Sequence, residues 1–148
     1  MSLESLQDRY FVLLAMFETY IMPPKIKKLA EYIRDYEGKP GDRNYRNNNF
    51  INARFHFGGY MPKYGKVTQD KDGFAVFPTA EQGWAYSCNM LLAACKGQSG
   101  TFKPNMTMVQ FFNVFAPTED KNDPATYCKH VCAQMGIPIT TQLKDLLV

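Results

Sequence analysis

Hydrophobic positions in the first quarter of the chain recur at helical spacing and predict two helices. The first covers Ser2 to Ile21, with Ser2 as its N-cap. Pro23-Pro24 separates it from a second helix, which runs to Glu37 and is ended by Gly38.

The second helix places a carboxylate where its apolar face meets a polar loop. Its face is formed by Ile26, Leu29, Ala30 and Ile33, and four residues further along the same face lies Glu37. Burial disfavours the charged form of a carboxyl group, so this position favours a raised pKa. A carboxyl group in that state is the setting of a general acid in glycoside cleavage.

The first helix carries a second apolar pattern, spaced three and four residues apart like a coiled-coil seam. Its members are Leu3, Leu6, Tyr10, Leu13, Phe17 and Tyr20. The stripe covers fewer than three heptads, and two interpretations stay open. The helix either packs on its own domain or is an attachment element that docks into a larger particle or another subunit.

After the second helix the pattern changes to a polar loop and then to short strands. Lys39 to Asn52 reads as the loop, and Phe55 to Phe77 as two or three strands, of which Phe74 to Phe77 is the clearest. Asp72-Gly73 is a hairpin turn in this interpretation. We therefore expect a small antiparallel sheet.

Three further helices are predicted from their caps. Thr79 with Gln82, and Thr107, begin two of them, and Asp123 begins the third, which ends at Met135-Gly136. The fold class is accordingly α+β, mainly helical, with the small sheet inserted early. The predicted core comprises Ile26, Leu29, Ile33, Phe77, Trp84, Leu91, Phe111, Phe115, Tyr127 and Val131.

Several ordered blocks between Lys25 and the C-terminus carry a family resemblance. They are Tyr36-Glu37-Gly38, Pro40-Gly41, Arg46 to Asn49 with Asn52 and Arg54, Gly73 to Thr79 with Glu81, Gly83 and Trp84, Phe115-Ala116-Pro117, Asn122-Asp123, Tyr127 and Leu143. Together they resemble a phage-associated peptidoglycan-hydrolase domain. That family has a lysozyme-like fold related to lytic transglycosylases and bacterial glucosaminidases.

The resemblance implies an enzyme that cleaves β-1,4 bonds between amino sugars, with Glu37 as the catalytic acid and without metal or cofactor. The substrate-binding residues that it implies are Tyr45, Asn48, Asn49, Asn52, Phe77, Thr79 and Tyr127. Among the asparagines, we expect at least one to fix the loop and another to face substrate. Residues 1–22 would form an N-terminal helix and residues 23–148 the lysozyme-like domain.

The implied partners are glycan strands of peptidoglycan and, through the N-terminal helix, other virion proteins. The expected location is the virion or the host cell envelope. We expect no signal peptide, so the particle or lysis would deliver the protein. No membrane span is expected either.

One departure from the family pattern leaves an alternative open. Where the family has Pro-Gly in the loop, this chain has Phe50-Ile51, and Ala53 replaces a leucine. The alternative is a structural or wall-binding virion module that kept the fold without turnover. The second carboxylate is also open among Asp42, Asp70, Asp72 and Asp120, and so is the choice between hydrolysis and transglycosylation.

Composition narrows the remaining possibilities. A length of 148 residues fits one domain, and a net charge of +3 without a basic block argues against nucleic acid. Cys128, His130 and Cys132 do not share one helix face, which argues against a metal site. We expect all four cysteines to be reduced, buried thiols.

Overall fold

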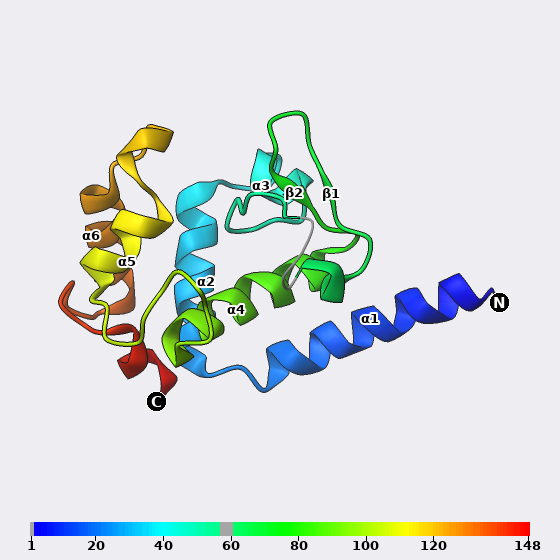
Figure 1. Cartoon of the computed structure of the whole chain (residues 1–148), viewed down its shortest axis with the longest axis horizontal. Coiled ribbons are helices and arrows are strands. Elements are labelled where there is room, and N and C mark those ends of the chain that lie inside the picture. The colour runs from blue at the N-terminus through cyan, green and yellow to red at the C-terminus, as the bar shows by residue number, and fades with distance from the viewer. Residues whose placement is uncertain (1, 57–60) are drawn as a thin grey trace. The chain divides into compact units, whose positions relative to one another are not determined.

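The computed structural model describes residues 2–56 and 61–148, and its elements are labelled in Figure 1. In chain order they are α1 (Leu3–Tyr20), α2 (Pro24–Glu37), α3 (Arg43–Arg46), η1 (Met61–Tyr64), β1 (Thr68–Gln69), β2 (Ala75–Val76), α4 (Ala80–Lys96), α5 (Met108–Phe115), η2 (Thr118–Asp120), α6 (Pro124–Met135) and η3 (Leu143–Leu147), where η marks a 3-10 helix. Most described residues are helical, and β1 and β2 form a small antiparallel sheet. The predicted α+β class is confirmed at this level.

The chain divides into two compact units, and each consists of two separate segments. The first unit comprises Met1–Met22 and Glu37–Asn89, and the second comprises Pro23–Tyr36 and Met90–Val148. This division differs from the expected boundary after Met22, because α1 groups with the loop and sheet. Glu37 is the last residue of α2 and also opens the second segment of the first unit.

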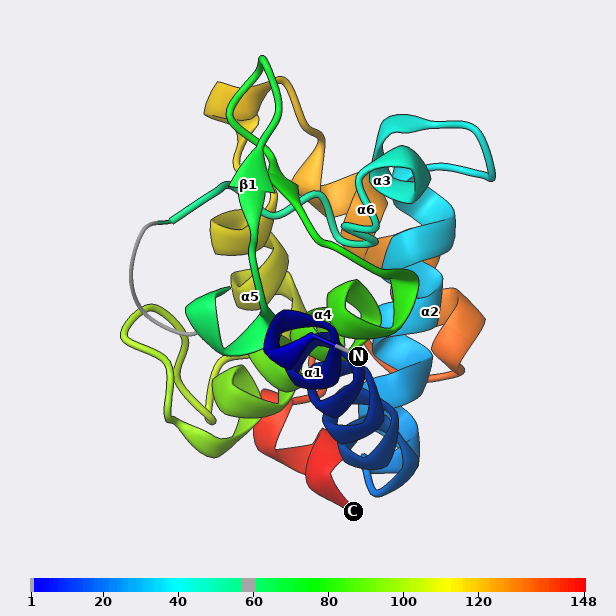
Figure 2. The same cartoon turned by 90° about the vertical axis from the view of Figure 1, so that its right-hand side faces the viewer.

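The sheet of the first unit is a hairpin with a third piece of chain beside it (Figure 2). Thr68 lies opposite Val76 in β1 and β2, and an isolated bridge joins Arg54 to Phe74. Gly73 in the connecting turn has a φ of 89°, a conformation that glycine adopts readily. The expected two or three short strands and the Asp72-Gly73 turn are therefore present.

The polar segment Lys39 to Asn52 differs from the expected continuous loop because it contains the short helix α3. The Asp42 carboxylate accepts the backbone N–H of Lys39 at 2.8 Å and closes the turn before this helix. The backbone N–H of Asn47 then returns to the carbonyl of Arg43 at 2.9 Å. A helix of four residues is too short to leave a hydrophobic period in the sequence, which is why the pattern missed it.

The second unit contains α5 and α6, and an aromatic cluster forms much of its core. The rings of Phe112 and Tyr127 lie 4.7 Å apart, and those of Tyr36 and Tyr127 stack at 3.9 Å. The Thr107 hydroxyl and the Gln110 side chain form a capping box at the start of α5. Asp123 caps α6, as the sequence predicted.

The predicted core is confirmed for eight of its ten residues. Ile26, Leu29, Ile33, Phe77, Leu91, Phe111, Tyr127 and Val131 are buried, whereas Trp84 and Phe115 are half-buried. All four cysteines are free and buried, and burial raises the pKa of both Cys95 and Cys132 to about 12. These thiols accordingly behave as small core residues.

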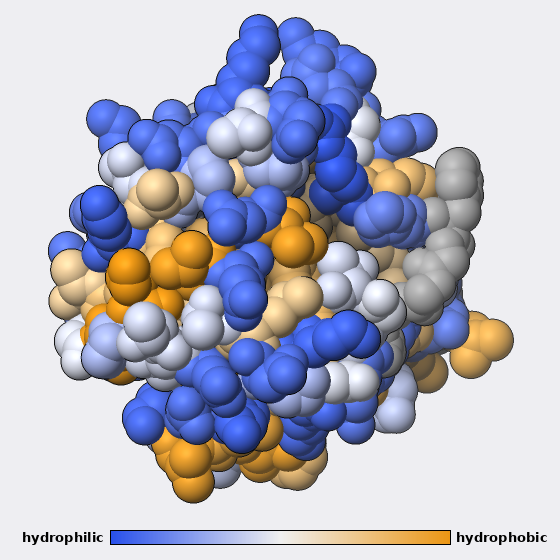
Figure 3. Space-filling view, turned by 60° about the vertical axis from the view of Figure 1, so that its left-hand side comes forward, coloured by the Kyte–Doolittle hydropathy of each residue, from blue (hydrophilic) through white to orange (hydrophobic). Residues whose placement is uncertain are grey.

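Exposed large apolar side chains are unevenly distributed among the described residues. Seven of them project from α1, namely Leu3, Leu6, Tyr10, Leu13, Met16, Phe17 and Tyr20. On the face shown in Figure 3, apolar side chains are instead interspersed with polar ones. No helix in the described part of the chain has the length and apolar character needed to cross a membrane.

Candidate active site around Glu37

Glu37 ends a helix whose buried face matches the sequence pattern. Ile26, Leu29, Ala30 and Ile33 all have no measurable exposure, and Glu37 follows on that face in the last turn of α2. The helix ends at Glu37, and the loop packs closely against the next residue, Gly38. A Cβ atom at residue 38 would overlap the Asn44 side-chain oxygen.

Burial is the main influence on the ionisation of the Glu37 carboxyl group. It raises the pKa of Glu37 from an ordinary 4.5 to about 7. A hydrogen bond from the Asn52 side chain and the positive charge of Arg43 both act in the opposite direction, but they do not cancel the effect of burial. Glu37 can therefore hold a proton close to neutral pH.

Two buried polar atoms beside this carboxyl group have unmet hydrogen-bonding capacity. Within residues 2–56 and 61–148, the structure gives no hydrogen-bond partner to Asn52 Oδ1 or to Arg43 Nε. Buried polar groups are normally paired, so such atoms point to an incomplete site.

The Arg43 guanidinium is held over an aromatic ring rather than in a described salt bridge. Its central carbon lies 3.8 Å from the centre of the Phe74 ring, and that of Arg54 lies 4.3 Å from it. Arg54 also donates a hydrogen bond to the Asp72 carbonyl at 3.0 Å. Phe74 in the hairpin thereby holds the positive charge of Arg43, which acts on Glu37.

The asparagines of the loop mainly fix its backbone, which meets one part of the expectation. Asn49 is completely buried; it donates to the carbonyls of Ala53 and Ala75 at 2.9 Å and accepts the Ala53 N–H at 2.9 Å. Asn48 donates to the Phe77 carbonyl at 3.1 Å. Asn48 and Asn52 both have φ near 51°, a left-handed conformation that asparagine tolerates better than most residues.

Among the other expected substrate contacts, several side chains serve as structural supports. Phe77 is only 1% exposed, and its ring lies 4.9 Å from that of Tyr86. The Thr79 hydroxyl caps α4 by accepting the Gln82 N–H at 3.2 Å and also donates to the Gln82 side-chain oxygen. This differs from the predicted capping box, in which the Gln82 side chain would accept the Thr79 backbone N–H.

Burial also corrects the expected ligand contact for Asn49, Phe77 and Tyr127, because none of the three exposes its side chain. Tyr127 lies in the second unit, within the aromatic cluster. The structure brings Asn52 to Glu37, and Tyr45 and Asn48 lie half-buried on the same unit. Tyr45 packs edge-on to Phe50 at 5.4 Å.

The Phe50-Ile51 pair that departs from the family pattern forms part of the core. Phe50 is 8% exposed, Ile51 is 1% exposed, and the Phe50 ring meets that of Trp84 edge-on at 5.8 Å. The two apolar residues thus anchor the loop from within, between the left-handed residues Asn48 and Asn52.

One of the four candidate second carboxylates is distinguished by its environment. Burial acts to raise the pKa of Asp70, but hydrogen bonds from the Phe74 N–H, the Asn47 side chain and the Asp72 N–H, with the charge of Arg43, hold it below its ordinary value. The three bonds are each 2.9 Å long. Asp70 is therefore an ionised group whose oxygens close the hairpin.

The sequence did not reveal the roles of three residues that shape the site, namely Arg43, Asp70 and Gly83. Arg43 lies in the unrecognised helix α3, and Asp70 was one of four equivalent aspartates. Gly83 belonged to a recognised block, yet its role needs the structure: a Cβ there would overlap the backbone carbonyl oxygen of Asn48. Gly83 thus lets α4 approach the loop.

Among the residues that the structure describes, no three His, Cys, Asp or Glu side chains are grouped so as to bind a metal. The His130 ring instead lies 5.3 Å from the ring of Tyr36, in the second unit.

Comparison with protein-family models, with curated proteins and with solved structures gives no match.

Proposed function

We propose that this protein cleaves β-1,4 bonds between amino sugars of peptidoglycan, with Glu37 as the general acid. The observation that carries the proposal is the half-buried carboxyl group of Glu37, whose pKa is raised to about 7 at the start of an asparagine-rich loop. A group of this kind gives its proton to the glycosidic oxygen as the bond to the sugar breaks. The fold of the proposed enzyme is lysozyme-like, as the sequence resemblance implies.

The surroundings of Glu37 support an amino sugar as the ligand. An acetamido group contains one N–H donor and one carbonyl acceptor. Asn52 Oδ1 can accept a hydrogen bond and Arg43 Nε can donate one, and both atoms lack a partner among the described residues. Both atoms are closed to solvent in the free protein, so in this proposal the sugar contacts them after the loop moves. Tyr45 and Asn48 complete the proposed contacts on the same unit, whereas Asn49 and Phe77 hold the loop and the wall in place.

In the proposed reaction Glu37 is the one catalytic carboxylate, which favours a transglycosylase route over hydrolysis. Asp70 is occupied by three hydrogen bonds within the hairpin, and Asp42 accepts the Lys39 N–H. In the proposed reaction Glu37 protonates the leaving oxygen and then, as a carboxylate, takes the proton from a hydroxyl of the same sugar. That hydroxyl oxygen bonds to the anomeric carbon, and the product is an anhydro sugar.

The proposal is tested by release of muropeptides from purified peptidoglycan. The wild type should release soluble fragments with anhydro ends, seen by mass analysis. Glu37→Gln keeps the shape but removes the transferable proton, so its rate should fall at least about a hundredfold. Glu31→Gln, on the same helix and paired with Lys28 at 3.6 Å, is the matched control and should cut normally.

Two results would overturn this assignment. A wild-type protein that releases nothing across the pH range would remove the catalytic proposal. Undiminished cleavage by Glu37→Gln would place the acid elsewhere. Reducing ends in place of anhydro ends would keep Glu37 as the acid but replace transglycosylation by hydrolysis.

The exposed apolar stripe of α1 favours a second candidate, a wall-binding or structural module of a virion. Such a module would bind glycan through the same loop without turnover and would be positioned by contacts of α1 with other proteins. Co-sedimentation with purified cell walls separates the candidates. Binding by the wild type without any release of fragments would favour the module, whereas binding accompanied by release favours the enzyme.

A further inference from the structure

Helix α1 has two faces with different surroundings. One face lies against its own unit: Ala15 is 3% exposed, and Phe11, Val12 and Thr19 are half-buried. The Glu18 carboxylate fastens this face by accepting a hydrogen bond from Asn89 at 2.7 Å and by pairing with Lys63 at 3.0 Å. The helix is therefore held in place without using its other face.

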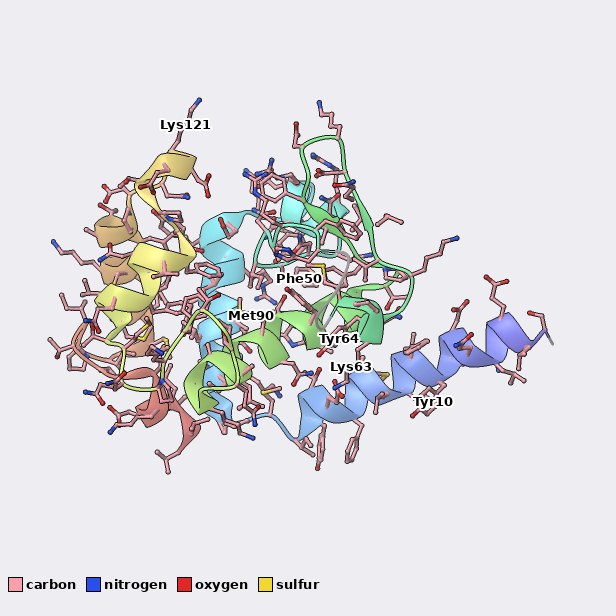
Figure 4. The ribbon with its side chains drawn as sticks, in the orientation of Figure 1. Tyr10, Phe50, Lys63, Tyr64, Met90 and Lys121 are labelled. Carbon is pink, nitrogen blue, oxygen red and sulfur yellow. The ribbon has the colours of Figure 1, made fainter. Side chains whose placement is uncertain are left out.

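The other face carries the six apolar residues that recur at alternating steps of three and four. Leu3, Leu6, Tyr10, Leu13, Phe17 and Tyr20 are between 52% and 84% exposed. Figure 4 shows Tyr10 projecting from the side of α1 opposite to Lys63 and Tyr64. The expectation that this helix packs on its own domain is therefore met through the opposite face, and the stripe itself is left exposed.

We propose that α1 pairs in parallel with α1 of a second copy of this chain. In heptad notation the stripe occupies every a position (Leu3, Tyr10, Phe17) and every d position (Leu6, Leu13, Tyr20) of the helix. A seam with this spacing is complementary to a helix with the same spacing, which a second copy supplies. Leucine occupies two of the three d positions, as in two-stranded parallel pairs, whereas the a positions hold Leu3, Tyr10 and Phe17 in place of the usual β-branched residues.

The residues that flank the stripe favour this partner and this orientation. In a parallel pair, a g position of one helix faces the e position of the next heptad in the other helix. That rule sets Met16 of one copy against Ile21 of the other, and these are the remaining strongly exposed apolar residues of the segment, at 55% and 61%. Arg9, at a g position, faces Leu14 of the other copy, so no like charges meet.

The acidic residues of α1 lie away from the proposed seam. Glu4 and Glu18 occupy b positions and Asp8 an f position, on the outer side of the pair. The body of each unit packs on that outer side through Ala15, also at an f position. Both copies can therefore keep their own packing while the seams meet.

The apolar area is large enough for a stable pair. Three of the eight exposed residues are aromatic, and each aromatic side chain can bury about 150–250 Å². The five aliphatic side chains add to this area. A standard interface buries about 800 Å² per partner. Because each α1 is already a folded helix fixed to its unit, pairing does not require the helix to form first.

Sedimentation equilibrium of the full chain tests the pairing. At tens of micromolar, the wild type should have the mass of a dimer. The double variant Leu6→Lys/Leu13→Lys should be monomeric, with its fold preserved in circular dichroism because both side chains are exposed in the single copy. The control Glu4→Lys/Asp8→Lys adds the same two lysines on the outer side and should stay dimeric.

A cross-link tests the orientation. Tyr20→Cys places a thiol opposite its counterpart in a parallel pair, so an added oxidant should join two copies through a disulfide. In an antiparallel pair residue 20 would instead meet residue 3, and only the double variant Leu3→Cys/Tyr20→Cys would cross-link. A monomeric wild type, equal masses for the two lysine variants, or cross-linking of the double cysteine variant alone would overturn the proposal.

Discussion

At the scale of single residues, the chemistry depends on opposing influences on one carboxyl group. Burial at the end of an apolar helix face raises the pKa of Glu37 to about 7, although Asn52 and Arg43 favour its charged form. The sequence alone predicted that the pKa of Glu37 is raised, because helical spacing places Glu37 at the end of the apolar face. It could not predict the two opposing contacts, since Arg43 lies on an unrecognised helix and Asn52 reaches Glu37 only after the loop has folded.

The raised pKa of Glu37 predicts how stability changes with pH. Below pH 4.5 the carboxyl group is protonated in both the folded and the unfolded chain. Between pH 4.5 and about 7 the unfolded chain loses this proton first, so folding becomes less favourable as pH rises. The pKa difference between the folded and the unfolded chain lowers the free energy of unfolding by at most about 3 kcal/mol. This decrease is complete above pH 7.

Glu37→Gln should remove the decrease in the free energy of unfolding that the wild type shows as pH rises. Urea unfolding at pH 4.5 and pH 8 should show that the variant gains stability over the wild type at pH 8, by up to about 3 kcal/mol, and much less at pH 4.5. Glu31→Gln, at a partly exposed ion pair with Lys28, should show no such pH-dependent gain. Parallel pH profiles for wild type and Glu37→Gln would contradict a raised pKa.

At the scale of elements, the helices were predictable and the connections between them were not. The caps Ser2, Thr107 and Asp123 act as their residue types predict, because a cap uses only neighbouring backbone. The loop around Asn49 instead depends on Ala75, which is 26 residues away. Such pairings are set by tertiary packing, and no local pattern encodes them.

Gly83 shows how one element depends on another. Alanine normally stabilises a helix relative to glycine, by about 0.5–1 kcal/mol. At this position the added Cβ would overlap the Asn48 carbonyl oxygen, which belongs to backbone and cannot move aside as a flexible side chain would. The overlap therefore outweighs the gain in helix propensity.

We expect Gly83→Ala to lower the free energy of unfolding by about 1–3 kcal/mol, as overpacking of a filled interior does. Urea denaturation measures this change. Gly100→Ala is the matched control, because nothing lies within 4 Å of a Cβ there and its φ is not positive. A Gly83→Ala protein as stable as the wild type would contradict the close approach of α4 and the loop.

At the scale of the whole molecule, the class of the fold followed from the sequence, whereas the grouping of its segments did not. The pattern placed α1 in a separate region before residue 23, but α1 groups with Glu37–Asn89. Helical spacing identifies an apolar face but not its partner, which is why the exposure of the α1 stripe became evident only from the structure. The same limit applied to Tyr127, whose buried position in the aromatic cluster depends on neighbours distant in sequence.

The central claim is that cleavage by the whole protein depends on the proton of Glu37, and the pH dependence of the initial rate of muropeptide release tests it most directly. A general acid acts only when protonated. The rate should therefore stay high as pH falls to about 7 and below, until other groups intervene, and it should decrease about tenfold per pH unit above about 7. A rate that stays constant or rises between pH 7 and pH 9 would contradict the account.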